Sequence, residues 1–469
     1  MCFEDQVATA LESHDFFAAE EPIYVSRAPG RLDVMGGNVD YTGGFVLQGL
    51  LREAVWVAVQ PRTDGRVRIF NPGAARFGWA PRIELTLSTL SDPAAVRRFC
   101  GQYQSAGWAC YVLGALYFLK NRHEWDNTSG ADLFIASDLP PNKGVSSSAA
   151  LTIATLKAAS AAHGINFDGI ALAVAGQWVE NVVVGAACGI MDQAAIVLGR
   201  KNHLLPLLCQ PCQLHPLLEL PHDIRIWGID SMAPRATSSR SYETARAAAF
   251  IGYKLLCRYE GIEPTPDAAS AIPRFTDARW SGSLSNLQPS EFRSRYESRL
   301  PEFLSGQEFL ACAGDHADPF TTIDPANEYP VRAAVRYAVE ENMRVRTVHG
   351  LLGAAAVSGA DNLLPLIGEI LCQSHAAYTE CGLGSEACDE LVTRALQAGL
   401  PGAKMTGGGG GGVVAILGRA EDRHTVYAVA QEYGVKCGAM PHVFEGSSSG
   451  TDSFGVLTMQ LALARVSQS

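Results

Sequence analysis

The segment from residue 133 to residue 161 constrains the fold most, because its pattern is that of a strand, a loop and a helix. Leu133-Phe-Ile-Ala136 is typical of a short buried strand, and Ser146 to Ala161, rich in Ala, Leu and Ile, predicts a long helix. The prolines and glycine of Leu139-Pro-Pro-Asn-Lys-Gly144 favour a turn between them. The first N–H groups of a helix have no internal partners and converge on whatever lies in front. The segment therefore predicts an anion-binding loop.

The residues of this loop suit phosphate. Gly144 allows the backbone to approach a ligand closely, and Ser146, Ser147 and Ser148 combine small size with hydroxyl donors. The loop is not a Walker A motif, because Gly-x-x-x-x-Gly-Lys-Ser/Thr is absent. Taken alone, the serines could instead cap the helix, so both interpretations stay open at this point.

Three further segments carry candidate chemistry. Cys188-Gly-Ile-Met-Asp192-Gln193 places one carboxylate among apolar residues, where a lone Asp is more often a helix cap or a partnered core residue. Six glycines at 407–412 separate Lys404-Met-Thr406 from an apolar run, which predicts a loop before a buried strand; a flexible linker is the alternative. The third segment runs from Arg27 to Gly44.

The rest of the chain predicts a mixture of strands and helices. We expect strands at 21–28, ending at the Ala28-Pro29-Gly30 break, at 46–59 and at 226–230, helices at 108–119 and 242–260, and helical structure across 331–399.

Together the motifs resemble those of the GHMP family of small-molecule kinases, and of galactokinases in particular. The likeness runs from about residue 20 to 460 and includes the galactokinase N-terminal signature, the phosphate loop, the segment of the catalytic aspartate and the third, glycine-rich motif. It implies an α+β, two-domain GHMP kinase fold with the active site in the cleft between the domains. We place the N-terminal domain at residues 1–225 and the C-terminal domain at 226–469.

The resemblance also implies roles for individual residues. Asp192 would face the anomeric hydroxyl of a sugar, and Arg31 beside it would favour the ionised carboxylate and offset charge on the γ-phosphate. Glu180 falls where the family has its Mg²⁺-binding glutamate, and Ser148 would complete that pair. The remaining implied contacts are with ATP, by Gly144, Ser146, Ser147, Gly407, Gly408 and Trp108, and with the sugar, by Asp40, Gly189 and Tyr242. Trp108 could equally be an ordinary core aromatic.

One departure from the galactokinase pattern bears on the substrate. Galactokinases carry a Glu-His pair that holds the 6-hydroxymethyl group of the sugar, and Gly37 and Asn38 stand in those two places. A galactose bound here would leave its 6-hydroxyl with fewer partners, at a cost of roughly 1–3 kcal/mol. Galactose without its C6 carbon is L-arabinose, which loses nothing.

A more specific likeness points the same way. Arg31-Leu-Asp-Val-Met-Gly-Gly37 and Cys381-Gly-Leu-Gly-Ser385 look like the kinase domain of plant L-arabinokinases. The expected reaction is therefore ATP-dependent phosphorylation of L-arabinose at its anomeric hydroxyl. D-galactose is the alternative substrate, and a catalytically inactive sugar- and ATP-binding sensor is a remote alternative.

Composition narrows the partners and the location. A formal net charge of −11 disfavours nucleic acid, whereas a small anion such as ATP can still bind to local dipoles. No apolar run reaches the roughly 18–20 residues of a membrane span, and Met1–Gln6 lacks the basic start of a secretory signal. Twelve scattered cysteines, with Cys209 and Cys212 read as a turn, favour reduced thiols and a cytoplasmic location. A monomer and a homodimer both remain open.

Overall fold

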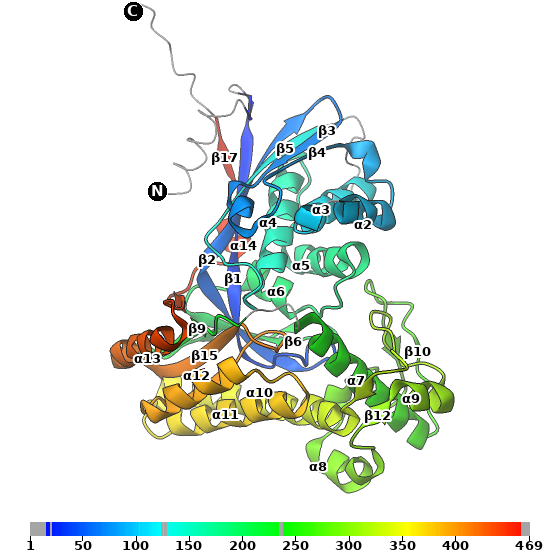
Figure 1. The fold of residues 1–469 in the computed structure, drawn as a ribbon, viewed down its shortest axis with the longest axis vertical. Coiled ribbons are helices and arrows are strands. Elements are labelled where there is room, and N and C mark those ends of the chain that lie inside the picture. The colour runs from blue at the N-terminus through cyan, green and yellow to red at the C-terminus, as the bar shows by residue number, and fades with distance from the viewer. Residues whose placement is uncertain are drawn as a thin grey trace, which may run out of the picture.

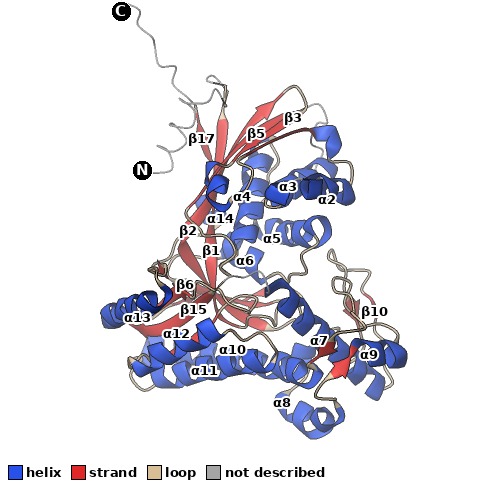
Figure 2. Cartoon of the chain, viewed as in Figure 1, coloured by secondary structure: helices blue, strands red, loops and turns tan. Residues whose placement is uncertain are grey.

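The computed structural model describes residues 16–18, 21–102, 104–122, 125, 129–233 and 238–460; the Met1–Gln6 segment lies outside these residues. Two sheets organise the fold: the larger one, called the upper sheet below, fills the upper half of Figure 1 and reaches into the lower half at β6, and the smaller one lies in the lower half. The larger, nine-stranded sheet has the order β17-β1-β2-β5-β3-β4, with β6 pairing to β2, β7 and β8. The smaller sheet has the order β14-β15-β9-β16. Helices and strands occur together in both parts of the molecule (Figure 2), and the predicted α+β class is confirmed.

The elements have the following bounds. The strands are β1 (Ile23–Met35), β2 (Phe45–Arg62), β3 (Arg66–Phe70), β4 (Arg82–Thr86), β5 (Gly130–Ser137), β6 (His203–Leu208), β7 (Gln213–Leu214), β8 (Leu218–Glu219), β9 (Ile224–Asp230), β10 (Thr265–Pro266), β11 (Phe275–Thr276), β12 (Leu304–Ser305), β13 (Glu328–Tyr329), β14 (Gly402–Met405), β15 (Val413–Arg419), β16 (Val443–Phe444) and β17 (Leu457–Met459). The helices are α2 (Pro93–Gln102), α3 (Ala109–Arg122), α4 (Ser147–Ala162), α5 (Gly169–Trp178), α6 (Met191–Leu198), α7 (Ser238–Tyr259), α8 (Pro289–Glu291), α9 (Gly306–Ala313), α10 (Val331–Ser358), α11 (Leu364–Glu380), α12 (Glu386–Gln397), α13 (Arg423–Cys437) and α14 (Thr451–Phe454).

The first strand is longer than the sequence predicts. The expected break at Ala28-Pro29-Gly30 is wrong, because β1 continues to Met35. The register of β1 against β2 shifts between Pro29 and Arg31, which leaves Gly30 outside the ladder. Such a bulge re-aims the side chains that follow it. The backbone N–H of Arg31 then donates to Val145 O at 3.2 Å, which ties the strand to the predicted phosphate loop.

The other predicted elements are present, with two refinements. The helical stretch 331–399 is three helices, α10 to α12, because Gly359 (φ 87°) and Gly382 (φ 76°) take backbone conformations that end a helix. The glycines at 407–412 are not a linker. A Cβ added at Gly409 would lie 2.8 Å from Leu383 Cβ, so this run is packed against the rest of the protein.

At strand β5 the upper sheet is buried on both faces, and successive residues of this strand point to opposite sides. Leu133 and Ile135 of β5 belong to the core under helices α2 to α6, which cover one face in Figure 1. Phe134, between them, points to the opposite face and packs in a smaller cluster with Phe16 and Phe17. The segment around Phe16 therefore acts as a cover for the second face.

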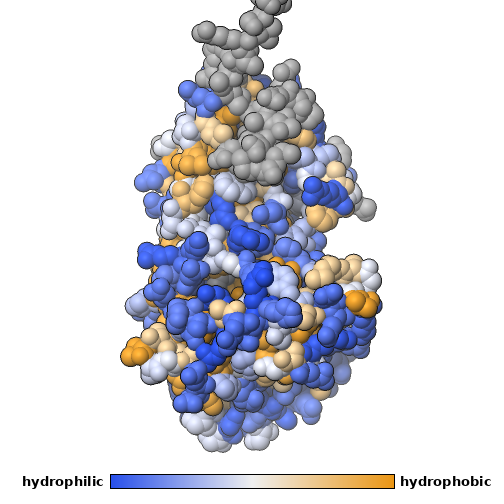
Figure 3. All heavy atoms as spheres, turned by 90° about the vertical axis from the view of Figure 1, so that its left-hand side faces the viewer, coloured by the Kyte–Doolittle hydropathy of each residue, from blue (hydrophilic) through white to orange (hydrophobic). Residues whose placement is uncertain are grey.

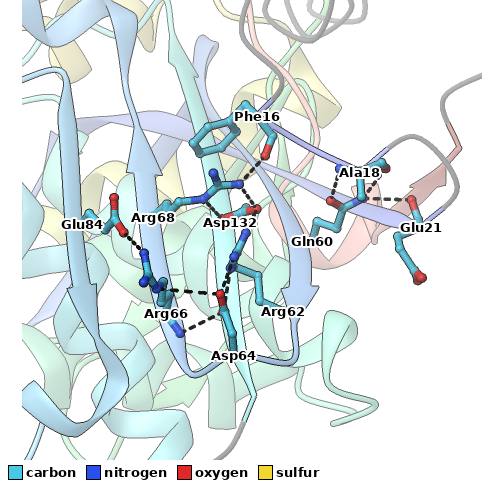
Figure 4. Close-up of polar contacts among 10 residues, drawn as sticks. All are labelled: Phe16, Ala18, Glu21, Gln60, Arg62, Asp64, Arg66, Arg68, Glu84 and Asp132. Atoms are coloured by element: carbon cyan, nitrogen blue, oxygen red, sulfur yellow. Dashed lines mark hydrogen bonds and ion pairs between the residues drawn. The ribbon is translucent and has the colours of Figure 1, made fainter.

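A buried carboxylate holds that cover in place (Figure 4). The Asp132 side chain, 3% exposed, accepts bonds from Arg62 Nη1 at 2.9 Å and from Arg68 Nε at 2.6 Å. Arg68 lies directly opposite Asp132 on β3, and its Nη2 also donates to Phe16 O at 2.7 Å. Gln60, opposite Asp132 on β2, bonds both the N–H and the carbonyl of Ala18. Asp132 thus joins three strands to the covering segment.

The two ends of the described chain meet in the upper sheet, where β17 pairs with β1. Strands β6 to β8 still pair within this sheet, and β9 is the first strand of the smaller one. The domain boundary at residue 225 stays a prediction.

The turn between β6 and β7 carries Cys209 and Cys212 as free thiols. Hydrophilic residues dominate the lower part of the face in Figure 3. Among the described residues, no helix is both long and apolar enough to cross a membrane.

Replacing Asp132 with alanine is expected to lower the free energy of unfolding by about 2 kcal/mol, because two arginines lose a buried partner. Chemical denaturation measures this change. The control is Glu84→Ala, whose partner Arg66 is 58% exposed and which is 56% exposed itself. Its effect should stay within about 0.5 kcal/mol. Equal effects of the two substitutions would contradict the role given to Asp132.

Candidate active site

A cavity of about 1230 Å³ collects most of the residues that the sequence singles out. Gly37 and Gly407 do not line it. The predicted site residues that do are Arg31, Asn38, Asp40, Trp108, Gly144, Ser146, Ser147, Ser148, Glu180, Gly189, Asp192, Tyr242 and Gly408. They come from β1 and the turn after it, from the residue before α3, from the phosphate loop and the first residues of α4, from the π-helix Val179–Val184, from α6 and the loop before it, from α7, and from the glycine run.

Asp192 and Arg31 form the central pair. Asp192 is the second residue of α6, where the helix dipole favours a negative charge. Arg31 reaches its Oδ1 with Nε at 2.9 Å and Nη2 at 2.8 Å, and donates from Nη1 to Gly144 O at 2.6 Å. Burial opposes the charge on Arg31, but Asp192 and Asp33 outweigh it and raise the pKa of the guanidinium. A permanent positive charge therefore lies between Asp192 and the phosphate loop.

Ser146 completes the surroundings of Asp192. Its hydroxyl donates to Asp192 Oδ2 at 2.5 Å, and it makes no side-chain capping bond to helix α4. Ser146 also has φ 62°, a left-handed conformation that non-glycine residues seldom adopt. The capping interpretation is therefore wrong for Ser146, whose side chain is turned toward the carboxylate instead.

The glycine run lies directly against the phosphate loop. A Cβ added at Gly407 would lie 2.7 Å from Gly144 O, and one at Gly412 would lie 2.7 Å from Lys143 O. Both glycines have positive φ, at 72° and 100°. Only glycine combines this backbone conformation with such a close approach. Gly407 therefore lies behind the loop, and Gly408 reaches the cavity.

Glu180 and Ser148 face the cavity together and suit a hard cation. Glu180 is 4% exposed, on the π-helix Val179–Val184, and its Oε1 accepts from Gln193 Nε2 at 2.8 Å. Burial and the nearby Asp192 raise the pKa of Glu180 to about 7, although hydrogen bonds from Gln193 and Ser148 oppose this. A cation bound at Glu180 would offset the free-energy cost of burying the negative charge of this carboxylate. An oxygen pair of this kind, together with nucleotide phosphates, fits the usual coordination of Mg²⁺.

The opposite end of the cavity is polar and buried. Asp40 is 6% exposed, and burial followed by repulsion from Asp192 raises its pKa to about 6. A Cβ at Gly189 would lie 2.1 Å from Asp40 Oδ2, so this position requires glycine. Asn38 is 3% exposed and its Nδ2 has no hydrogen-bond partner. Tyr242, on α7, packs edge-on to Tyr41. Such unsatisfied polar groups fit a ligand rich in hydroxyls.

A third part of the cavity is aromatic and combines the predicted Trp108 with two residues that the sequence did not indicate. Trp108 lines it and is also a core residue, 8% exposed, whose indole N–H donates to Ala80 O at 3.3 Å. Phe77 and Trp79 join it from the loop after β3, with their rings 5.0 Å apart. Their segment shows no periodicity or motif, so only the folded chain brings these aromatic rings to the cavity.

Asp40 should make the ligand-free protein less stable as the pH rises. The pKa of Asp40 is higher in the folded than in the unfolded chain, so folding favours the protonated carboxyl group. The contribution of Asp40 to stability is therefore full below about pH 4 and is lost as the pH rises past about 6. Asp40→Asn should therefore raise Tm by on the order of 3 °C at pH 7.5 and by less at pH 5. Thermal unfolding at both pH values measures this difference.

The matched control is Asp361→Asn, because the Asp361 side chain is 91% exposed. That substitution should leave the pH dependence of Tm unchanged. A gain in Tm from Asp40→Asn that is equal at both pH values would show that the charge of Asp40 is not its cause.

Comparison with known proteins identifies related domains in this chain. The N-terminal domain model of GHMP kinases matches residues 110–200, the C-terminal model matches 352–436, and the galactose-binding signature of galactokinases matches 14–61. An L-arabinokinase of Arabidopsis thaliana is 36% identical over 95% of this chain. The chain spans 47% of that relative's length. A galactokinase of Roseiflexus sp. is 28% identical, with 88% of each chain covered.

Solved structures share the fold. The Lactococcus lactis galactokinase complexed with galactose superposes with a TM-score of 0.73 at 23% identity, over 98% of this chain and 99% of its own. The mevalonate kinase of Methanococcus jannaschii gives a TM-score of 0.52 at 12% identity, over 91% and 98%. The chain therefore contains the N-terminal and C-terminal domains of GHMP kinases, in that order, and has the GHMP kinase fold.

Proposed function

We propose that this protein is an ATP-dependent sugar kinase that phosphorylates the anomeric hydroxyl of L-arabinose. The observation that carries the proposal is the position of Asp192. In one cavity, this carboxylate lies beside the phosphate loop through Arg31 and Gly144, and the same cavity contains the buried polar groups of Asn38 and Asp40. A phosphoryl donor and a hydroxylated acceptor can therefore meet at Asp192.

Asp192 would orient the acceptor hydroxyl and take up its proton. Its two oxygens already accept bonds from Arg31 and Ser146, but each carboxylate oxygen has a second lone pair. The sugar hydroxyl can donate to one of these. Two fixed donors prevent the carboxylate from rotating, so the hydroxyl is held in one direction. Positioning of this kind is the main requirement of phosphoryl transfer.

The nucleotide side would rely on charge and on backbone donors. The unpaired N–H groups at the start of α4 and the hydroxyl of Ser147 would bind phosphate oxygens. Arg31 would offset the charge that develops during transfer. Mg-ATP supplies the phosphoryl group, and Ser148 with Glu180 would hold the metal ion. Phe77, Trp79 and Trp108 offer aromatic faces for the base.

Two features support L-arabinose as the sugar. Gly37 and Asn38 provide no carboxylate or imidazole for a 6-hydroxyl, and the relative with 36% identity is an L-arabinokinase. D-galactose is the second candidate, because the galactose-binding signature of galactokinases matches residues 14–61. Both sugars present the same anomeric hydroxyl, so the chemistry at Asp192 is common to both.

With Mg-ATP, kcat/KM should be higher for L-arabinose than for D-galactose, by roughly 5- to 150-fold, because the 6-hydroxyl would lose partners worth about 1–3 kcal/mol. Coupled detection of ADP release measures both values. D-galacturonate, D-glucuronate and N-acetylgalactosamine serve as further acceptors. A preference for D-galactose would contradict the proposed substrate, and ATP binding without turnover of any sugar would contradict the proposed activity.

Asp192→Asn should lower kcat by on the order of 10²- to 10⁴-fold, because the amide cannot accept the proton of the sugar hydroxyl. Its size matches that of the carboxylate, so calorimetric binding of L-arabinose and of ATP should be retained. Unchanged kcat would show that Asp192 is not the catalytic group. Loss of sugar and ATP binding together with a lower Tm would indicate a damaged fold. Asp192→Glu is then the second variant to assay.

A further inference from the structure

Position 37 has no room for a side chain. An ideal Cβ built on Gly37 would lie 1.9 Å from the Tyr378 hydroxyl oxygen and 2.3 Å from Asp33 Oδ2. Both distances are far shorter than a van der Waals contact, so both groups would have to move. Gly37 is therefore required by what surrounds it, and its φ is not in the left-handed region.

Tyr378 is held firmly in this place. It lies on α11, has no exposed surface, and donates from its hydroxyl to Gly407 O at 3.0 Å. Tyr337 of α10 packs edge-on against its ring, with centroids 5.3 Å apart and planes at 88°. The Tyr337 hydroxyl donates to Gly37 O at 2.6 Å. The two tyrosines thus fix position 37 from its carbonyl side and from the side where a Cβ would be.

Asp33 is equally constrained. Gln48 Nε2 donates to its Oδ1 at 2.8 Å, and Lys404 Nζ lies 3.5 Å from its Oδ2. The side chains of Asp33 and Lys404 have no exposed surface. Displacing either group would leave a buried charge without its partner, which is strongly unfavourable. A side chain at Gly37 would therefore meet two obstacles that cannot easily move.

The absence of a side chain at position 37 affects the cavity wall next to Asn38. Gly37 and Tyr378 do not line the cavity, whereas Asn38 does. Because position 37 must stay empty, positions 37 and 38 contribute only the neutral amide of Asn38, whose Nδ2 has no partner, beside the carboxylate of Asp40. An acidic side chain that could accept a bond from an exocyclic hydroxyl of the sugar cannot be added here while Tyr378 is present.

We propose that Tyr378 is a specificity-determining residue, which keeps position 37 free of a side chain and so leaves this end of the pocket without a carboxylate at position 37 that could hold an exocyclic hydroxymethyl group of the sugar. The identity of the sugar rests on the proposed function, whereas the steric link between Gly37 and Tyr378 does not. It follows that exchanging Gly37 and Asn38 for the Glu-His pair of galactokinases is insufficient to create a site for the exocyclic hydroxymethyl group. Tyr378 must change with them.

The steric link is tested by a double-mutant cycle of Gly37→Ala and Tyr378→Phe, read by thermal unfolding. Gly37→Ala should lower Tm by on the order of 3 °C or more, because it overpacks the site. In the Tyr378→Phe background the loss should fall clearly, though not to zero, since Asp33 remains. Additive effects of the two substitutions would overturn the proposed link.

Two controls separate the link from general damage. Tyr337→Phe removes a hydroxyl that touches the same glycine at its carbonyl, so it should not reduce the loss caused by Gly37→Ala. Gly350→Ala adds a Cβ in helix α10 where no atom lies within 4 Å, and it should not lower Tm. Relief of the Gly37→Ala loss by Tyr337→Phe as well would show that the effect is not specific to Tyr378.

The effect on specificity is tested with two multiple variants. Gly37→Glu with Asn38→His is compared with the same pair plus Tyr378→Leu, using D-galactose and L-arabinose. The triple variant should have a galactose-to-arabinose ratio of kcat/KM at least about fivefold above that of the double variant, a change of about 1 kcal/mol. An unchanged ratio would overturn the role in specificity. If the unmodified protein phosphorylates neither sugar, the proposed function fails, and the unfolding cycle still decides the steric link.

Discussion

The buried guanidinium of Arg31 is the interaction on which the site depends. It joins Asp192 at the start of α6 to the carbonyl of Gly144 in the phosphate loop, while its own N–H bonds Val145. Three elements distant in sequence are thereby fixed around one positive charge. A charge in this position needs a carboxylate partner to remain buried. Asp192 therefore serves two purposes. It is the carboxylate partner that the buried Arg31 requires, and it is the oriented base that the proposed reaction requires.

The second constraint on the site is the close approach of glycine backbone to neighbouring groups. Gly407 approaches the Gly144 carbonyl, Gly189 approaches the Asp40 carboxylate, and Gly37 approaches the Tyr378 hydroxyl, each more closely than any side chain would permit. Each contact forms one wall of the site, or the support behind it. These contacts pack the walls of the site closely against backbone and buried polar groups, which limits the space for displacement. This close packing suits a reaction that depends mainly on positioning.

Much of this arrangement was predictable from local signals. The strand, loop and helix around Ser146 and the strand after the glycine run follow from residues that are close in sequence. The pairing of Asp192 with Arg31, 161 residues apart, was implied by the resemblance to GHMP kinases and not by a local pattern. Two predictions failed for physical reasons. The Pro29-Gly30 pair was expected to end a strand, but a bulge absorbs it. Ser146 was a candidate cap, but Asp192 is a stronger acceptor for its hydroxyl.

The sequence by itself determined the family resemblance, the mixed α and β class, the phosphate loop and the identity of the central carboxylate, because each depends on residue types at short, fixed spacing. Only the tertiary structure decided what surrounds them. Phe77 and Trp79 reach the cavity, and Tyr378 fills the space beside Gly37, from segments without a motif of their own. Residues 37 and 378 meet because helices α10 and α11 pack against the turn after β1. A contact between residues so far apart in the chain depends on the whole fold, so no local pattern could predict it.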